Sequence, residues 1–277
     1  MPTFESNPLS TWWKRLLQVN QSSNTGVDAT TRSIQTGDGA TSSMSFSDDV
    51  LKVQPQNDNT TGAFIVANKG GSSILATDTT NSKVLVGASQ VAANTQYAYF
   101  GVTGVDQYFS NALADTHYAV PFMSAYANFS VETVANYAMG SSTSSSFNDT
   151  NPASSLTIST TAASLITSYW YVMDDITIDA VKWLHAADTA TGDDVAAHLM
   201  AYTVDTGNGS TSGDLSSGVV VADGATITNA GYEQIYYQSM TIQSANVDAG
   251  RIIMFTFASD TINSDYGINA CVKYHIR

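Results

Sequence analysis

The sequence has few charged residues and only one cysteine. Charged side chains make up 12% of the 277 residues, about half of the ~25% that is usual for soluble domains. The single cysteine, Cys271, excludes an intramolecular disulfide and a zinc site built on cysteines. No run of eighteen apolar residues occurs, so we expect no insertion into a membrane. Tyr and Val are abundant among the remaining residues, which favours β-structure.

Basic residues are scarcer than acidic ones, and the imbalance is uneven. Residues 1–109 hold six basic and eight acidic side chains (net −2), whereas residues 110–277 hold four basic and sixteen acidic ones (net −12). Nucleic acids and anionic membranes are bound by basic surfaces, so neither is predicted as a partner. Residues 1–5 contain neither the basic nor the apolar part of a secretory signal peptide, so no export signal is expected.

Residues 64–87 consist of three short apolar runs that are separated by turn sequences. The runs cover residues 64–67, 74–76 and 84–86, and the turns contain Gly70-Gly71 and Asp78 to Asn81. Strands this short cannot bury a core within one chain, because an isolated hairpin is only marginally stable in water. We therefore expect copies of the chain to supply the missing faces in a homo-oligomer.

Residues 7–18 predict a short helix with a broad apolar face that includes two adjacent tryptophans. A helix of this length is marginal alone, so the tryptophans need a surface to pack against. That surface is either the oligomer itself or another protein, because Trp and Arg commonly carry binding energy at interfaces. In the second case the anchor consists of Trp12, Trp13, Lys14, Arg15 and Leu16.

The rest of the chain predicts a junction and then an antiparallel β-sandwich. The aromatic residues between 88 and 109, among them Tyr97, Tyr99 and Phe100, are expected to form core at the junction. Beyond residue 110, short strands recur at the spacing typical of a sandwich. Period-two alternation places a common set of side chains inside it: Ile253, Phe255, Phe257, Ile268, Val272 and Tyr274. The predicted domains are therefore residues 1–20, 21–109 and 110–277.

Several of these stretches resemble bacteriophage fibre proteins. The lines LATDTTNSKVLVG (75–87) and SFSDDVLKVQP (45–55) resemble fibre shafts in which three chains intertwine. The lines DDITIDAVKWLHAAD, TVDTGNGSTSGDLSSG and NVDAGRIIMFTF, all after residue 170, resemble the heads of phage fibre and capsid-decorating proteins. The resemblance implies an all-β homotrimer at the virion surface, with a short N-terminal helix, an intertwined trimeric β shaft and a C-terminal β-sandwich of the jelly-roll type.

The function implied by this resemblance is structural and non-enzymatic. The N-terminus would bind a capsid or tail protein of the same virion, and the head would attach to the host surface. Two alternatives stay open: a capsid-decorating trimer that stabilises the shell, and a cell-surface protein that binds or cleaves glycans.

Two acidic, glycine-containing loops, 187–194 and 205–214, are the candidate contacts with a host glycan or protein. Their expected contact residues are Asp188, Asp193, Asp194, Asp205, Asn208 and Asp214. Paired carboxylates can hydrolyse glycans, and loop oxygens can bind Ca²⁺, but adjacent aspartates are ordinary in turns. The order Asp-x-Asp-x-Asp-Gly is missing, and the four histidines lack HxH or HExxH spacing. The sequence therefore predicts no catalytic, metal or cofactor site.

Overall fold

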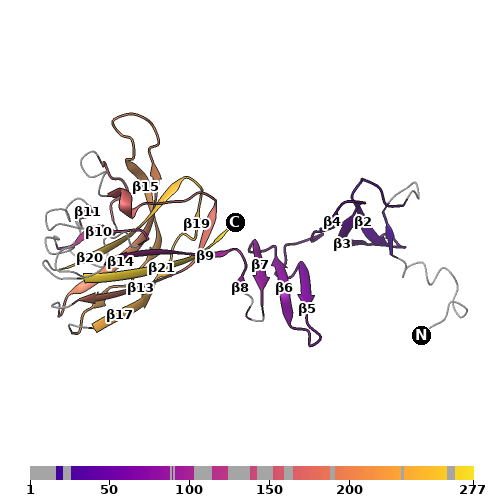
Figure 1. Ribbon diagram of the computed structural model, residues 1–277, viewed down its shortest axis with the longest axis horizontal. Helices are drawn as coiled ribbons and strands as arrows, with labels where there is room; N and C mark the ends of the chain where they lie inside the picture. Colours follow the sequence, from indigo (N-terminus) through magenta and orange to yellow (C-terminus); the bar gives the residue numbers. More distant parts are fainter. Residues whose placement is uncertain are drawn as a thin grey trace, which may run out of the picture. The chain divides into compact units, whose positions relative to one another are not determined.

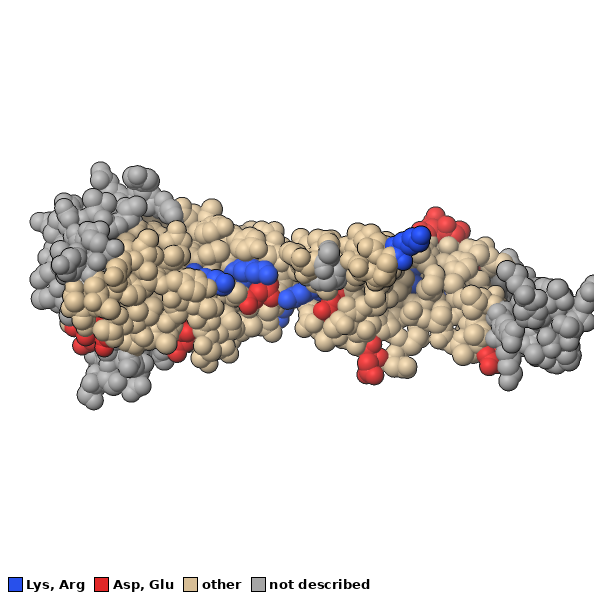
Figure 2. Space-filling model, turned by 90° about the horizontal axis from the view of Figure 1, so that it is seen from below, with Lys and Arg blue, Asp and Glu red and all other residues tan. Residues whose placement is uncertain are grey.

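The computed structural model describes residues 17–20, 26–87, 89, 91–102, 114–123, 138–141, 152–158, 165–187, 191–231, 234–260 and 266–277. Nearly all regular structure in these residues is β, in antiparallel sheets (Figure 1), which confirms the predicted all-β class. The chain divides into two compact units, Met1–Asn94 and Thr95–Arg277. On the face drawn in Figure 2, uncharged side chains cover most of the surface, in keeping with the composition.

The first unit contains two four-stranded antiparallel sheets. One has the order β1 (Leu17–Val19), β2 (Arg32–Thr36), β3 (Thr41–Phe46), β4 (Leu51–Val53). The other has the order β5 (Phe64–Ala67), β6 (Ser73–Asp78), β7 (Lys83–Val86), β8 (Val91–Ala92). Strands β5, β6 and β7 contain the three apolar runs between residues 64 and 87, so the prediction of short strands there is confirmed.

The helix predicted over residues 7–18 is wrong at its C-terminal end. Leu17 and Gln18 belong to β1, where Leu17 pairs with Thr36 and Val19 with Ile34. Pairing with β2 supplies backbone partners along the strand, and this tertiary gain overrides a weak local helix preference. Residues 7–16, including the proposed anchor residues Trp12, Trp13, Lys14, Arg15 and Leu16, lie outside the described residues.

The second unit contains two larger antiparallel sheets. The path of the eight-stranded sheet is β11 (Ala138–Ser141), β10 (Thr116–Val120), β20 (Arg251–Ser259), β14 (Asp194–Val204), β15 (Leu215–Asp223), β18 (Thr241–Ile242). Strand β12 (Trp170–Tyr171) also pairs with β20, and β16 (Ile227–Thr228) pairs with β14. The five-stranded sheet has the order β17 (Gln234–Ser239), β13 (Ile176–Ala187), β21 (Tyr266–Ile276), β9 (Thr95–Val102), and β19 (Asn246–Val247) pairs with β13.

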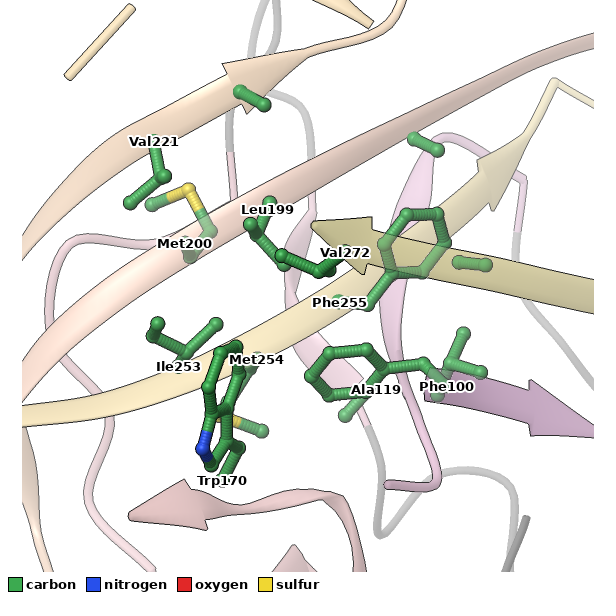
Figure 3. Close-up of a cluster of buried hydrophobic side chains, with 14 of the residues drawn as sticks. Phe100, Ala119, Trp170, Leu199, Met200, Val221, Ile253, Met254, Phe255 and Val272 are labelled. Carbon is green, nitrogen blue, oxygen red and sulfur yellow. The ribbon is translucent and has the colours of Figure 1, made fainter. Parts of the chain in front are cut away.

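These two sheets face each other across one apolar core. The ring of Trp183, from the five-stranded sheet, lies 6.1 Å from Phe255 and 5.9 Å from Phe257, both in β20 of the other sheet. Phe100 of β9 stacks on Phe255 with ring centroids 6.0 Å apart, and Figure 3 shows the two rings within the same cluster as Val272. The second unit is therefore sandwich-like.

The predicted core positions are largely confirmed. Ile253, Phe255, Phe257, Ile268 and Val272 are all buried. Tyr274 is only partly buried, although it packs against the core and its ring lies 4.9 Å from that of Trp170.

The aromatic junction differs from the expectation. The second unit begins at Thr95 and not near residue 110, because β9 pairs with β21 from Thr95 to Val102. Phe100 is buried as predicted, but Tyr97 and Tyr99 are 53% and 45% exposed. Alternation along β9 places these two tyrosines on the outer face of the sheet, so the prediction that they form core is wrong.

Candidate functional site

The loop Asp205–Asp214 joins β14 to β15 and is held by bonds within itself. Asp205 accepts hydrogen bonds from the backbone N–H of Gly207 (2.8 Å) and from the hydroxyl of Thr211 (2.6 Å). These bonds lower the pKa of the Asp205 carboxyl, the bond from Thr211 having the largest effect. Asn208 lies at the exposed tip. The loop therefore has a defined shape, and Asn208 is the predicted contact residue best placed to meet a partner.

The base of the same loop is fixed to a distant segment of the chain. The Asp214 carboxylate accepts a hydrogen bond from the backbone N–H of Ile158 at 2.8 Å. Gly213 has φ +90°, and a Cβ there would lie 2.7 Å from Ile158 Cδ1. The position thus requires glycine both for its backbone conformation and for the close approach of Ile158. Asp214 is a positioning residue for the loop.

An apolar pocket of about 660 Å³ opens beside this loop. The residues that line it come from the 158–171 region, from β14 and β20, and from the loop: Ile158, Ile166, Tyr169, Tyr171, Val204, Thr206, Ser212, Gly213 and Ile252. The volume is within the range of ~300–1,000 Å³ that is usual for small-molecule sites. None of the described residues that line the pocket carries a charge, so the pocket suits a neutral ligand with an apolar surface.

Two tyrosines give the pocket its polar groups and its ring surfaces. The hydroxyl of Tyr169 donates to the backbone oxygen of Gly213 at 3.4 Å. Burial, with a smaller contribution from the Asp214 charge, raises the pKa of Tyr169 to about 12, so its phenol stays protonated at neutral pH. The Tyr171 ring is half exposed, as is usual for an amphipathic ring that meets a partner. The run of aromatics at 169–171 was the sequence feature that could have indicated this pocket.

The other predicted loop turns inward at its end. Asp193 is only 7% exposed, and it accepts a hydrogen bond from the Tyr266 hydroxyl at 2.8 Å. The backbone N–H of Asp194 donates to the Asp260 carboxylate at 2.8 Å. Asp188 lies outside the described residues. The structure therefore places Asp193 in the interior. None of the predicted contact residues that the structure describes is among the residues that line the pocket.

Asp193 belongs to a buried polar network inside the sandwich. His185 Nε2 lies 2.8 Å from Asn229 Oδ1, and the Asn229 amide donates to the Tyr266 hydroxyl at 3.4 Å. The His185 ring stacks on Trp183 with centroids 4.8 Å apart. Burial lowers the pKa of His185, against the opposing effect of Asn229. The network pairs His185 Nε2 with Asn229, whereas His185 Nδ1 is buried without a hydrogen-bond partner among the described residues. Sequence spacing does not predict this network.

The remaining histidines are also buried and contact other side chains of the fold. His198 Nε2 lies 3.1 Å from Asp223 Oδ1, and the His198 ring contacts that of His117 edge-on at 4.9 Å. His275 Nδ1 lies 3.0 Å from Asp179 Oδ2. Within the described part of the chain, no three His, Cys, Asp or Glu side chains are arranged to hold a metal ion. The same part of the chain contains no helix that is long and apolar enough to cross a membrane.

Comparisons with protein families and with curated proteins identify no relative of this chain. No protein-family model matches the chain, and no curated protein matches it either.

Proposed function

We propose that this chain is a structural fibre protein of a bacteriophage virion. Three copies associate through the first unit as a β shaft, the N-terminus binds a capsid or tail protein, and the second unit is a jelly-roll head that attaches to the host surface. The proposal combines the fibre-like lines of the sequence with two features of the structure: the exposed apolar strands of the first unit, and the pocket beside the Asp205–Asp214 loop.

The observation that carries the proposal is the exposure of the β5–β8 sheet. All four residues of β5 are exposed, and Ile65 is 55% exposed. Ile74 of β6 and Val84 and Val86 of β7 are exposed large apolar residues as well. Neighbouring residues of a strand point to opposite faces, so β5 leaves apolar side chains open on both sides of the sheet. Association with further copies would remove this surface from water.

Light scattering on the full chain at micromolar concentration tests the association, and we expect the mass of a trimer. Ile74→Asp places a charge on the exposed apolar surface and should shift the mass toward the monomer. Thr80→Asp adds the same charge at the turn after β6, where the side chain is exposed, and serves as the matched control. A folded wild-type monomer at this concentration would contradict the proposal.

The pocket and the Asn208 tip together form the proposed host contact. Neutral lining, tyrosine rings and loop hydroxyls fit an uncharged glycan. Tyr171→Ala should reduce adsorption to host cells without changing thermal unfolding, and Met173→Ala, also exposed, is the neighbouring control. Equal adsorption by both variants and wild type would remove the pocket from the proposal.

Among the alternatives, a glycan-binding protein of a cell surface is favoured over a glycan-cleaving one. Glycoside hydrolysis generally uses two carboxyl groups that flank the scissile bond. The residues lining the pocket, all within the described segments, include no Asp or Glu. Binding to a glycan array without release of product would support this alternative, and the position of labelled protein on virus particles would separate a fibre from a shell-decorating trimer.

A further inference from the structure

The outer face of the five-stranded sheet is a second apolar surface, distinct from the pocket. Five large side chains on it are exposed, from strands β9, β13 and β17: Tyr97, Tyr99, Leu184, Ile235 and Tyr237. Ile235 is 72% exposed. Half-exposed aromatic rings and two aliphatic side chains together present on the order of 400 Å², the size at which a patch on a single chain is commonly a binding surface.

Strand register makes these side chains one continuous surface. Tyr237 lies opposite Leu184, which lies opposite Asn269. Two residues before Leu184 in β13, Lys182 lies opposite Cys271, which lies opposite Tyr99. Directly paired residues of antiparallel strands project to the same face, with Cβ atoms about 5 Å apart. The surface therefore runs across all four strands from β17 to β9.

The charge on this face is opposite to that of the unit around it. Lys182 and Lys273 both project from it, and they are two of the four basic residues in 110–277, against sixteen acidic ones. Lys182 Nζ lies 5.8 Å from the centroid of the Tyr237 ring. The face extends from the paired residues Ile235, Ala186 and Gly267 to the paired residues Ala180, Lys273 and Tyr97. None of the described side chains that point outward between these two sets is Asp or Glu. Asp179, beyond these two sets, pairs with His275.

We propose that a second copy of this chain binds to this face, which we name the tyrosine–lysine face: Tyr97, Tyr99, Lys182, Leu184, Tyr237 and Lys273. The inference rests on the proposed homo-oligomer and adds a second contact to it, in the head. A neighbouring copy, whose net charge is −14, is complementary in charge to a face that carries two lysines. Association of the first units raises the local concentration of the second units.

The charge pattern also sets the symmetry of the contact. If two copies met through the same face, Lys182 and Lys273 would lie against a surface of equal sign, which is unfavourable. The face must therefore meet a different, acidic surface of the next copy. A heterologous contact of this kind forms a closed ring if its rotation closes, and an open filament if it does not. A closed ring of three copies satisfies this requirement and agrees with the proposed trimer.

Cys271 provides a probe at the centre of the face. It is the only cysteine of the chain, it is half-buried, and it lies between Lys182 and Tyr99 in the strand register. A neighbouring copy would cover it, whereas in an unassociated head a thiol reagent would reach it. The reference thiol is Met173→Cys in a Cys271→Ser background, because Met173 is 77% exposed.

The experiment measures maleimide labelling of the native full chain, with the mass determined by light scattering. We expect wild-type Cys271 to react roughly tenfold or more slowly than the reference thiol. Lys182→Glu with Lys273→Glu should bring its rate toward that of the reference, whereas Lys52→Glu with Lys69→Glu, two exposed lysines of the first unit, should leave it slow. If the first variant unfolds, Tyr99→Ser replaces it.

The outcomes separate this inference from the proposed function. A wild-type trimer in which Cys271 reacts equally fast with and without the face substitutions overturns the inference and leaves the trimer standing. A wild-type monomer overturns the homo-oligomer itself, and the head contact with it. A trimer in which only the face substitutions expose Cys271 supports both.

Discussion

The two units use strands of the same class in different ways. The strands of the first unit have two to six residues, and only Ala76 and Asp78 among its described residues are buried. The second unit has strands of eleven and twelve residues, and Phe255, Phe257, Tyr202 and Trp183 are among its fully buried side chains. The difference shows that the second unit holds a core of its own, whereas the first lacks the buried area that usually stabilises a domain.

Rough energies agree with this comparison. Burying one large apolar side chain contributes about 1.5–3 kcal/mol, and the second unit contains many such side chains in one cluster. Ala76 is the one buried apolar residue among those described in the first unit. The β5–β8 sheet therefore depends on hydrogen bonds and turns within one chain, and on other copies for apolar burial.

The largest expected effect is in the core of the second unit. Phe255 is 0% exposed, so Phe255→Ala removes packing from both sheets and should cost about 3–5 kcal/mol of unfolding free energy. Met173→Ala, at an exposed position of the same unit, should stay within about 0.5 kcal/mol. Urea unfolding of both variants measures the difference. A cost below about 1 kcal/mol at Phe255 would contradict its burial between the two sheets.

Glycine-to-alanine substitutions should destabilise the two units by different mechanisms. A Cβ at Gly218 would lie 2.5 Å from Tyr202 Cε1 and 3.0 Å from Ser154 Cα, so Gly218→Ala should cost about 1–3 kcal/mol through overpacking. Gly71, between β5 and β6, has φ +86° and open space around it, so Gly71→Ala should cost about 1–2 kcal/mol through backbone strain alone.

The two mechanisms predict different rescues, to be read by thermal unfolding. Tyr202→Phe should not reduce the stability loss caused by Gly218→Ala, because the clash is with carbons of the ring, which Phe keeps. Tyr202→Ala removes the ring and should recover part of the lost stability. Gly71→Asn should be milder than Gly71→Ala, because Asn tolerates the left-handed region. If Asn and Ala are equivalent at Gly71, strain is not the cause.

Acid should affect the two units in different pH windows. Burial lowers the pKa of His185 below its ordinary 6.5, so the unfolded chain binds more protons there and the second unit loses stability as pH falls below about 6.5. In the first unit, mainly the hydrogen bond with Arg32 lowers the pKa of Asp28 from 3.8 to about 2. Its contribution is present above 3.8 and is lost as pH falls toward 2.

Unfolding between about pH 7 and about pH 5 tests this difference, since the effect of His185 begins there, below its ordinary pKa of 6.5, and the Asp28 window lies lower. His185→Gln should flatten the dependence of stability on pH in this range. Asp28→Asn should leave it unchanged and alter only the more acidic range. An unchanged slope in His185→Gln would show that burial of this ring has no part in acid sensitivity.

The sequence predicts which residues of a strand face the core better than it predicts which strands pair with each other. Period two placed Val272 inside correctly, because burial alternates along most of β21, as local strand geometry requires. Phe255 is buried as well, but every residue of β20 after Arg251 is buried, so alternation does not distinguish its two faces there. The sequence also predicted Tyr97 and Tyr99 as core, because aromatic composition was considered without the register of β9 against β21. The predicted helix ignored the pairing of Leu17 with Thr36, a contact between residues far apart in sequence.

The same limit applies to the candidate site. Asp205–Asp214 was predicted as a loop because glycine and hydroxyl residues follow one another there, and the structure bears this out. Asp193 looks equivalent in sequence, but it is buried because Tyr266 lies beside it in the fold. The pocket joins Ile158, Tyr171 and Val204, which no spacing rule connects. Long-range packing decides which of these aspartates is exposed, Asp205 and not Asp193.

The smallest effects are expected in the Asp205–Asp214 loop, most of which is exposed, as is strand β5 of the β5–β8 sheet in the first unit. Asp214→Ala removes the acceptor for the Ile158 N–H and should lower the unfolding free energy by about 1–2 kcal/mol. Asn208→Ala, at the exposed tip, should change it by less than about 0.5 kcal/mol. Adsorption to host cells should distinguish a residue that contacts the host from a residue that only stabilises the loop. If the tip meets the host, Asn208→Ala weakens adsorption at unchanged melting temperature, because its side chain faces outward. If Asp214→Ala alone weakens adsorption, and in proportion to its lost stability, the loop only supports the pocket and Asn208 is no contact.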